Sequence, residues 1–238
     1  MRSKDTRTLW LRWVAANALG EMFGLGLTFA VGSVIISSLE NQQSGFVILI
    51  SFLVAIASGA IEATLVGLAQ WWAMHPWFPM INRGVWWLAT LTGALVAYVL
   101  GYLPSSLMSL SEQAPQTSAP AAEPAQSLVL LLAAGLGAAG GAVLSFAQWL
   151  VLRHKVRGAF IWIPANVLAW LVGMPIIFWG IDTAQKLGGM FWLILFMAGV
   201  LLLTGLVVGA IHGAFLVRLA KFEQATTVET GSIISPPL

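Results

Sequence analysis

The chain has 238 residues, of which 59% are hydrophobic and only 8% are charged, and its mean hydropathy is +0.89. Because soluble domains carry roughly 25% charged residues, this composition excludes a water-soluble globular protein and predicts an integral membrane protein. The formal net charge is +2, and the lack of cysteine excludes disulfides, thiolate catalysis and cysteine-ligated metal clusters.

Six apolar segments follow one another along the chain, and each is long enough to cross a bilayer. Their apolar runs are continuous, whereas the strands of a membrane barrel would alternate apolar and polar residues. Helices are therefore favoured, because a helix satisfies its own backbone polar groups in lipid. The sequence predicts an all-α membrane protein with one integral membrane domain over residues 1–238. The predicted spans lie near residues 13–38, 47–73, 85–103, 128–152, 160–181 and 189–217.

Two segments lie outside the predicted spans. Residues 104–127 are rich in Pro, Ala, Ser, Gln and Glu, which predicts a flexible outer loop. Residues 222–238 are polar and end in Ser-Pro-Pro-Leu, which predicts a disordered cytoplasmic tail.

The distribution of Lys and Arg predicts the orientation. With both termini in the cytoplasm, ten of the 11 basic residues lie inside and only Lys186 lies outside. The predicted partner is therefore the bilayer with its anionic inner leaflet. A nucleic-acid partner is excluded, because the basic residues lie at span ends rather than on a recognition helix.

Two short patterns recur at the ends of the predicted spans. The first, third and fifth spans begin with a Trp, followed three residues later by Ala and then by a polar residue. The second and fourth spans end at a Gln-Trp pair, and His212 occupies the aligned position in the sixth. These patterns predict three tandem helical hairpins over about residues 11–76, 85–155 and 160–221. The residues concerned are Trp13 with Asn17, Trp86 with Thr90, Trp162 with Asn166, Gln70 with Trp71, and Gln148 with Trp149.

The hairpins predict how the helices are arranged. Each hairpin crosses the membrane twice, so the three copies share one orientation and are related by an axis along the membrane normal. The favoured arrangement is a pseudo-threefold bundle of six transmembrane helices. A row of three hairpins is the alternative, but it would expose more polar surface to lipid.

The segment 148–166 carries the most distinctive combination of these patterns. It joins Gln-Trp-Leu-x-Leu-Arg at a span end, a short basic loop and Trp-x-x-Ala-Asn at the next span start. In this it resembles a group of bacterial membrane proteins, frequent in cyanobacteria and Chloroflexi-like genomes, that mostly carry no assigned function. The resemblance covers nearly all of the chain except the outer loop and the tail, and the first hairpin departs from it at Met74-His75-Pro76. It implies this architecture and a bacterial plasma membrane or thylakoid-type membrane, and it implies no mechanism.

Six polar side chains lie about one turn from the cytoplasmic ends of the spans and are expected at one depth. Polar groups in a span need partners, and their repetition in all three hairpins favours interhelical hydrogen bonds, worth about 0.6–2 kcal/mol each. A ligand or ion site is the alternative. We call these residues the polar layer: Asn17, Gln70, Thr90, Gln148, Asn166 and His212.

Glu21 and Glu62 are the only acids within the predicted spans, and both belong to the first hairpin. Glu21 lies eight residues after Trp13 and Glu62 lies eight residues before Gln70, so their depths match. Two close carboxyls in an apolar setting would share a proton, which suits proton-coupled transport or cation binding. The alternative is that one or both stay protonated or face a partner subunit. The aligned positions of the other hairpins hold no acid: Ala94 and Gly140, and Trp170 and Thr204.

Three functions remain open from the sequence. The chain lacks the common motifs for phosphate binding, zinc-dependent hydrolysis and serine hydrolysis, so it is not predicted to be an enzyme. The first prediction is a non-catalytic scaffold or accessory subunit of a larger membrane complex, with another membrane protein as partner. The second is a small transporter or channel for protons, cations or a solute that uses Glu21 and Glu62. The third is a pigment- or haem-binding subunit that uses His212, although no cofactor or metal site is required by the sequence.

Overall fold

The computed structural model describes residues 5–37, 45–112 and 124–233. Among the described residues, six helical stretches of 26 residues or more are each long and apolar enough to cross a membrane. The protein is therefore a six-span integral membrane protein, as the sequence predicted. The helices are α1 (Thr6–Ser37), α2 (Gly45–Met74), α3 (Arg83–Glu112), α4 (Gln126–Leu152), α5 (Trp162–Ala184) and α6 (Met190–Ile233), with a short 3-10 helix η1 (Ala159–Ile161) before α5.

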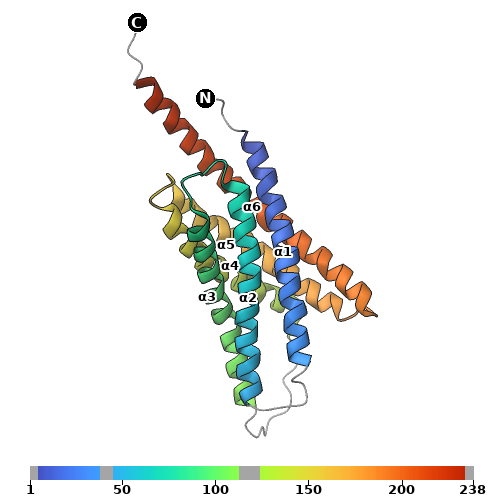
Figure 1. Ribbon diagram of the computed structural model, residues 1–238. Coiled ribbons are helices and arrows are strands. Elements are labelled where there is room, and N and C mark those ends of the chain that lie inside the picture. Colours follow the sequence, from blue (N-terminus) through green and yellow to red (C-terminus); the bar gives the residue numbers. More distant parts are fainter. Residues whose placement is uncertain (1–4, 38–44, 113–123, 234–238) are drawn as a thin grey trace.

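The six helices form a ring. Each helix packs against the next one along the chain, and α6 packs back against α1. An open row of hairpins is therefore excluded, because α1 and α6 would lie at its opposite ends. Figure 1 shows the N- and C-termini at one end of the ring, which we call the terminal end, and the opposite end is called the far end.

Short polar residues begin two of the helices at the terminal end. The carboxylate of Asp5 accepts hydrogen bonds from the backbone N–H groups of Arg7 at 2.9 Å and Thr8 at 3.3 Å. These bonds, chiefly the one from Arg7, lower the pKa of Asp5 below its ordinary value. Asn82 caps α3 in the same way, accepting from Gly84 at 2.9 Å. Both caps satisfy backbone donors that a helix start leaves free.

The loop predicted over residues 104–127 is shorter in the structure. Helix α3 continues through Pro104 to Glu112, and α4 begins at Gln126. A proline removes one backbone hydrogen bond from a helix but does not forbid its continuation, and no further proline or glycine follows before Glu112. The remainder of the predicted loop, residues 113–123, lies outside the described residues.

The tail predicted to be disordered over residues 222–238 is helical as far as Ile233. Its first turn is held by a tertiary contact that sequence reasoning did not foresee. The carboxylate of Glu223 accepts a hydrogen bond of 2.7 Å from the backbone N–H of Arg157, in the loop between α4 and α5. Residues 234–238 lie outside the described residues.

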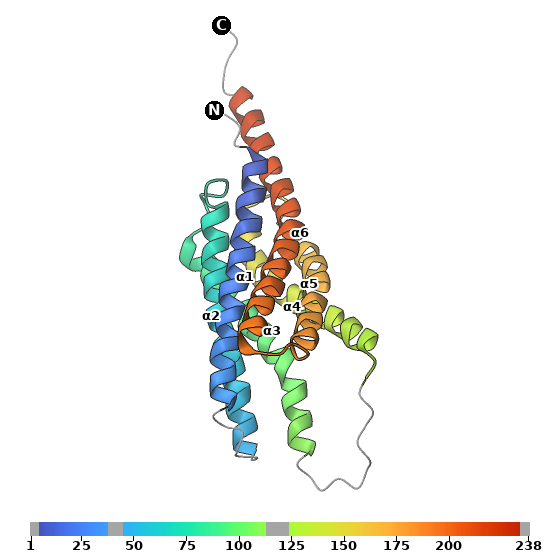
Figure 2. The same cartoon turned by 90° about the vertical axis from the view of Figure 1, so that its right-hand side faces the viewer.

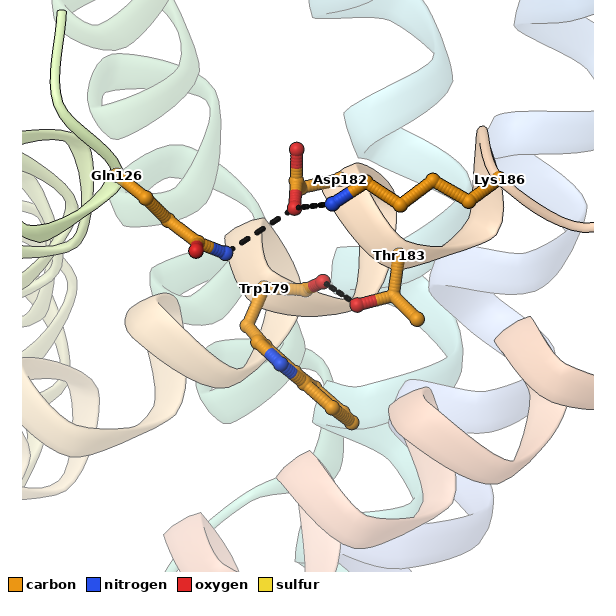
Figure 3. A network of polar contacts seen from close by, with 5 residues as sticks. All are labelled: Gln126, Trp179, Asp182, Thr183 and Lys186. Atoms are coloured by element: carbon orange, nitrogen blue, oxygen red, sulfur yellow. Dashed lines mark hydrogen bonds and ion pairs between the residues drawn. The ribbon is translucent and has the colours of Figure 1, made fainter.

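A polar network at the far end ties α4 to α5 (Figure 3). Gln126, the first residue of α4, donates to Asp182 Oδ2 at 3.1 Å, and Lys186 forms an ion pair with the same oxygen at 2.8 Å. The Thr183 hydroxyl donates to the carbonyl oxygen of Trp179 at 2.8 Å. Exposed ion pairs contribute only about 0–1 kcal/mol, so this network orients the helix ends more than it stabilises them.

Glycines allow α4 and α5 to pack backbone against backbone. A methyl group added at Gly137 would overlap the carbonyl oxygen of Trp170, and one added at Gly141 would lie 2.6 Å from the carbonyl oxygen of Asn166. The two glycines are four residues apart and form the small-residue ridge that brings membrane helices together.

We predict that Gly137→Ala destabilises the protein by about 1–3 kcal/mol, because the added methyl group meets backbone that cannot yield without moving α5. Gly135→Ala is the matched control on the same helix, since its added methyl group has no neighbour within 4 Å. Thermal unfolding in detergent, followed by circular dichroism, compares the two variants. Equal unfolding midpoints would contradict the close packing of α4 on α5.

Candidate functional site

Three tryptophans meet in the terminal half of the ring. Trp13 on α1, Trp86 on α3 and Trp162 on α5 are each fully buried. The ring of Trp162 packs edge-on against Trp13 at 5.7 Å and against Trp86 at 6.2 Å between ring centroids. Edge-to-face aromatic contacts of this kind stabilise a core beyond the area they bury. We call the three residues the tryptophan cluster.

The structure joins four members of the polar layer into one hydrogen-bonded chain beside this cluster. Gln148 accepts from Trp162 Nε1 at 2.9 Å and donates to Thr90 Oγ1 at 3.0 Å. Gln148 also donates to Gln70 Oε1 at 3.3 Å, and Gln70 donates to Asn17 Oδ1 at 2.9 Å. All of these side chains are buried. The chain links five of the six helices, α1 to α5, with neutral groups alone.

The other two members of the polar layer bond differently. Asn166 donates to the carbonyl oxygen of Trp162 at 2.9 Å, on its own helix. His212 is buried with its ring centroid 5.5 Å from that of Trp162 and 6.5 Å from that of Trp13. Neither of its ring nitrogens has a hydrogen-bond partner among the residues that the structure describes. The alignment of His212 with the two glutamines therefore does not extend to their hydrogen bonds.

The terminal half of the ring is closed. Buried apolar side chains surround the tryptophan cluster and continue to the terminal end, among them Leu9, Phe78, Leu152 and Leu216. Together with the polar layer they form a packed core that separates the middle of the ring from this end.

We predict that Gln148→Leu destabilises the protein by about 2–4 kcal/mol, because it leaves the Trp162 indole N–H and the Gln70 carbonyl buried without partners. Gln185→Leu is the matched control, since Gln185 is exposed. Denaturant titration in mild detergent measures both. A Gln148→Leu variant as stable as the parent would show that the hydrogen-bonded chain does not hold the helices together.

Glu21 on α1 and Glu62 on α2 lie within hydrogen-bonding reach of each other midway along the ring, and we call them the carboxyl pair. Glu21 is 1% exposed, and its Oε2 atom has no hydrogen-bond partner among the described residues. Two glycines on α1 allow this approach. A methyl group added at Gly24 would lie 2.9 Å from the Cα atom of Glu62, and one added at Gly20 would lie 3.2 Å from that of Val66.

A third side chain completes this site. Tyr98 on α3 donates its hydroxyl hydrogen to Glu62 Oε2. Its ring lies over Gly59, where an added methyl group would come within 2.9 Å of three ring atoms. Gly59 therefore provides the space that lets Tyr98 reach the carboxyl pair.

Sequence reasoning paired Glu21 with Glu62 but missed Tyr98. One signal was available, because the chain has only two tyrosines and both lie one turn apart within the third span. Their ring centroids are 5.8 Å apart in the structure.

A cavity of about 410 Å³ extends from Glu62 toward the far end. Residues of α1 to α5 line it, and Ala94 and Leu144 lie on its wall one turn from Thr90 and Gln148 of the polar layer. The cavity is partly open. Figure 2 shows that the last turns of α3 and the start of α4, at the far end, point away from each other. Its volume is in the range of ordinary small-molecule sites, roughly 300–1,000 Å³.

The cavity exists because the second hairpin has small residues at the depth of the carboxyl pair. Ala94 and Gly140, which align with Glu21 and Glu62, both line it, and Gly137 and Gly141 line it where α4 packs against α5. The site is therefore asymmetric, with acids on one side of the ring and open volume on the other.

Comparisons with protein-family models, with curated proteins and with solved structures found no match for this chain. The resemblance to bacterial six-span proteins therefore stays a prediction. Within the described residues, no three His, Asp or Glu side chains gather where they could hold a metal ion.

Proposed function

We propose that this protein is a small, non-catalytic membrane transporter that moves a proton, a cation or a small solute and that Glu62 is its working carboxyl. The observation that carries the proposal is the position of Glu62, which contacts Glu21 on one side and lines the cavity on the other. A carboxyl at mid-membrane is costly. Because Glu62 lines the cavity, its carboxyl can contact a ligand there, whereas the carboxyl of a purely structural acid could not.

The polar layer supports a structural role beside this site. Five of its members are uncharged amides or a hydroxyl, and four of these bond to one another across helices. In transport they would form the closed gate on the terminal side, since a carrier must close one side of its site while the other is open. Neutral hydrogen bonds suit such a gate, because they can be exchanged for bonds to water without separating buried charges.

We also propose that the terminal end faces the cytoplasm. The described basic residues gather there, and Lys186 is the one described at the far end, which matches the positive-inside pattern. The cavity would then open toward the outside of a bacterial plasma membrane or into the lumen of a thylakoid-type membrane. The basic residues at the terminal end are Arg7, Arg12, Arg83, Arg153, Lys155, Arg157, Arg218 and Lys221.

A threefold origin of the ring is part of the proposal, and recurring contacts between hairpins support it. A glycine of each hairpin's second helix packs against the polar residue in the first helix of the next hairpin around the ring. The tryptophan cluster likewise takes one residue from each hairpin. Three residues before Gln70 and His212, the pairs are Gly67 with Thr90 and Gly209 with Asn17; seven residues before Gln148 and His212, they are Gly141 with Asn166 and Gly205 with Asn17.

We predict that proteoliposomes containing the protein show proton or cation flux and that Glu62→Gln lowers this flux about tenfold or more, because it removes the carboxyl on the cavity wall. Glu21→Gln is expected to act in the same direction. Asp182→Asn is the matched control, since this acid is at the far end and outside the cavity. A pH-sensitive dye inside the vesicles and isotopic cation uptake provide the measurements.

The same experiment separates the proposal from its alternatives. Well-folded protein without any Glu62-dependent flux would refute transport and favour the scaffold or accessory subunit, which copurification of a membrane partner would then identify. A visible absorption band in protein purified from its native host, lost in a His212→Phe variant, would instead favour a pigment- or haem-binding subunit.

A further inference from the structure

The cavity combines one acid with an aromatic wall. Among the described residues that line it, Glu62 is the only carboxyl and none is Lys, Arg or His. Five aromatic side chains from α1, α3 and α5 complete the wall: Phe29, Tyr98, Tyr102, Trp170 and Phe178. Aromatic faces and a carboxylate both attract a cation. This part of the wall therefore favours a ligand that carries a positive charge.

The two aliphatic hydroxyl groups of the wall are already engaged, and the indole N–H of Trp170, which has no hydrogen-bond partner among the described residues, is a donor that cannot ligate a cation. The Thr28 hydroxyl donates to the carbonyl oxygen of Ser58 at 2.8 Å, and the Ser105 hydroxyl donates to that of Tyr102 at 2.9 Å. A metal cation needs roughly six oxygen ligands or a retained water shell, which this wall does not supply. An apolar ligand with a single positive charge matches it better.

We propose that the cavity binds a lipophilic organic monocation, such as a quaternary ammonium or phosphonium compound or a protonated aromatic amine, with its charge beside Glu62 and its apolar groups against the aromatic wall. This inference rests on the proposed function and names the class of ligand that the same site takes. The size of the cavity, about 410 Å³, suits a ligand with several rings or short alkyl chains.

Binding has a defined proton balance. Both carboxyls of the pair hold a proton when the cavity lacks a cation, since an apolar setting disfavours an unpaired carboxylate. When the cation enters, one carboxyl O–H bond breaks, its proton leaves to water, and the pair keeps the other proton and faces the cation with a single negative charge. The groups facing Glu62 are Glu21 from α1 and the hydroxyls of Tyr98 and Tyr102 from α3, and α4 and α5 line the cavity with no titratable side chain. Cation binding should therefore tighten as pH rises.

The test uses two probes of nearly equal size and opposite charge. Purified full-length protein in detergent is titrated with tetraphenylphosphonium and with tetraphenylborate, and binding is measured by calorimetry at several pH values. We expect saturable binding of the phosphonium alone, stronger at higher pH, and weakened at least about tenfold by Glu62→Gln. Tyr98→Phe keeps the ring and removes its hydroxyl, so it is expected to change affinity less than Glu62→Gln.

A second variant tests the cavity without changing charge. Ala97→Phe fills space on the cavity wall and is expected to abolish phosphonium binding. Leu100→Phe is its matched control, because Leu100 is on the same helix, is exposed and does not line the cavity. Size-exclusion profiles of all the variants establish that they fold.

The outcomes separate this inference from the proposed function. Equal binding of both probes, or phosphonium binding unaffected by Glu62→Gln and Ala97→Phe in folded protein, would overturn it. A phospholipid that copurifies and that an excess of phosphonium does not displace would also overturn it. Glu62-dependent proton flux without phosphonium binding would leave the transport proposal intact and refute this ligand class. Phosphonium binding without flux would support the site and refute transport.

Discussion

Direct contact between helix backbones is the constraint on which this structure depends. Lipid provides no hydrophobic force to press two membrane helices together, so they approach where small residues let their backbones touch. Here Gly20 and Gly24 bring α1 onto α2, and Gly137 and Gly141 bring α4 onto α5. The first contact places Glu21 beside Glu62, and the second holds α5 against α4 beside the cavity, whose space comes from Ala94 and Gly140. Close backbone packing and small side chains together therefore shape the candidate site.

The ring has two functional zones at different depths. Near the terminal end, interhelical hydrogen bonds and edge-on indole contacts fill the core and leave no charged side chain among the members of the polar layer and the tryptophan cluster. One turn further into the membrane, the pattern breaks down, because the first hairpin has acids where the second has Ala94 and Gly140. In the proposed threefold repeat, the shared residues build the zone near the terminal end and the residues that differ build the cavity, which is why the carboxyl pair, rather than the polar layer, carries the functional proposal.

Much of the fold could be predicted from the sequence, because a segment must be long and apolar to cross a bilayer and polar residues within it stand out. The six spans and the pairing of Glu21 with Glu62 follow from apolar length and from counting residues along a helix. The helical continuation of α3 beyond Pro104 was missed, because a single proline is a weak stop signal within an otherwise helical segment. Tyr98 and the cavity were missed for another reason. They depend on how side chains of different hairpins meet, and the residue pattern within one helix does not predict such contacts. The lack of a hydrogen-bond partner for His212 among the described residues was missed for the same reason. Alignment with Gln70 and Gln148 predicts where the side chain lies along its helix but does not predict its hydrogen bonds.

The tryptophan cluster has a further consequence. Indole rings whose centroids lie 5.7 and 6.2 Å apart in a dry core couple electronically, and this coupling depends steeply on their separation and angle. Each ring belongs to a different hairpin, so any rearrangement that opens the terminal end must separate them. The near-ultraviolet circular dichroism of these tryptophans should therefore change when the hairpins move, and no attached label is needed to follow the movement.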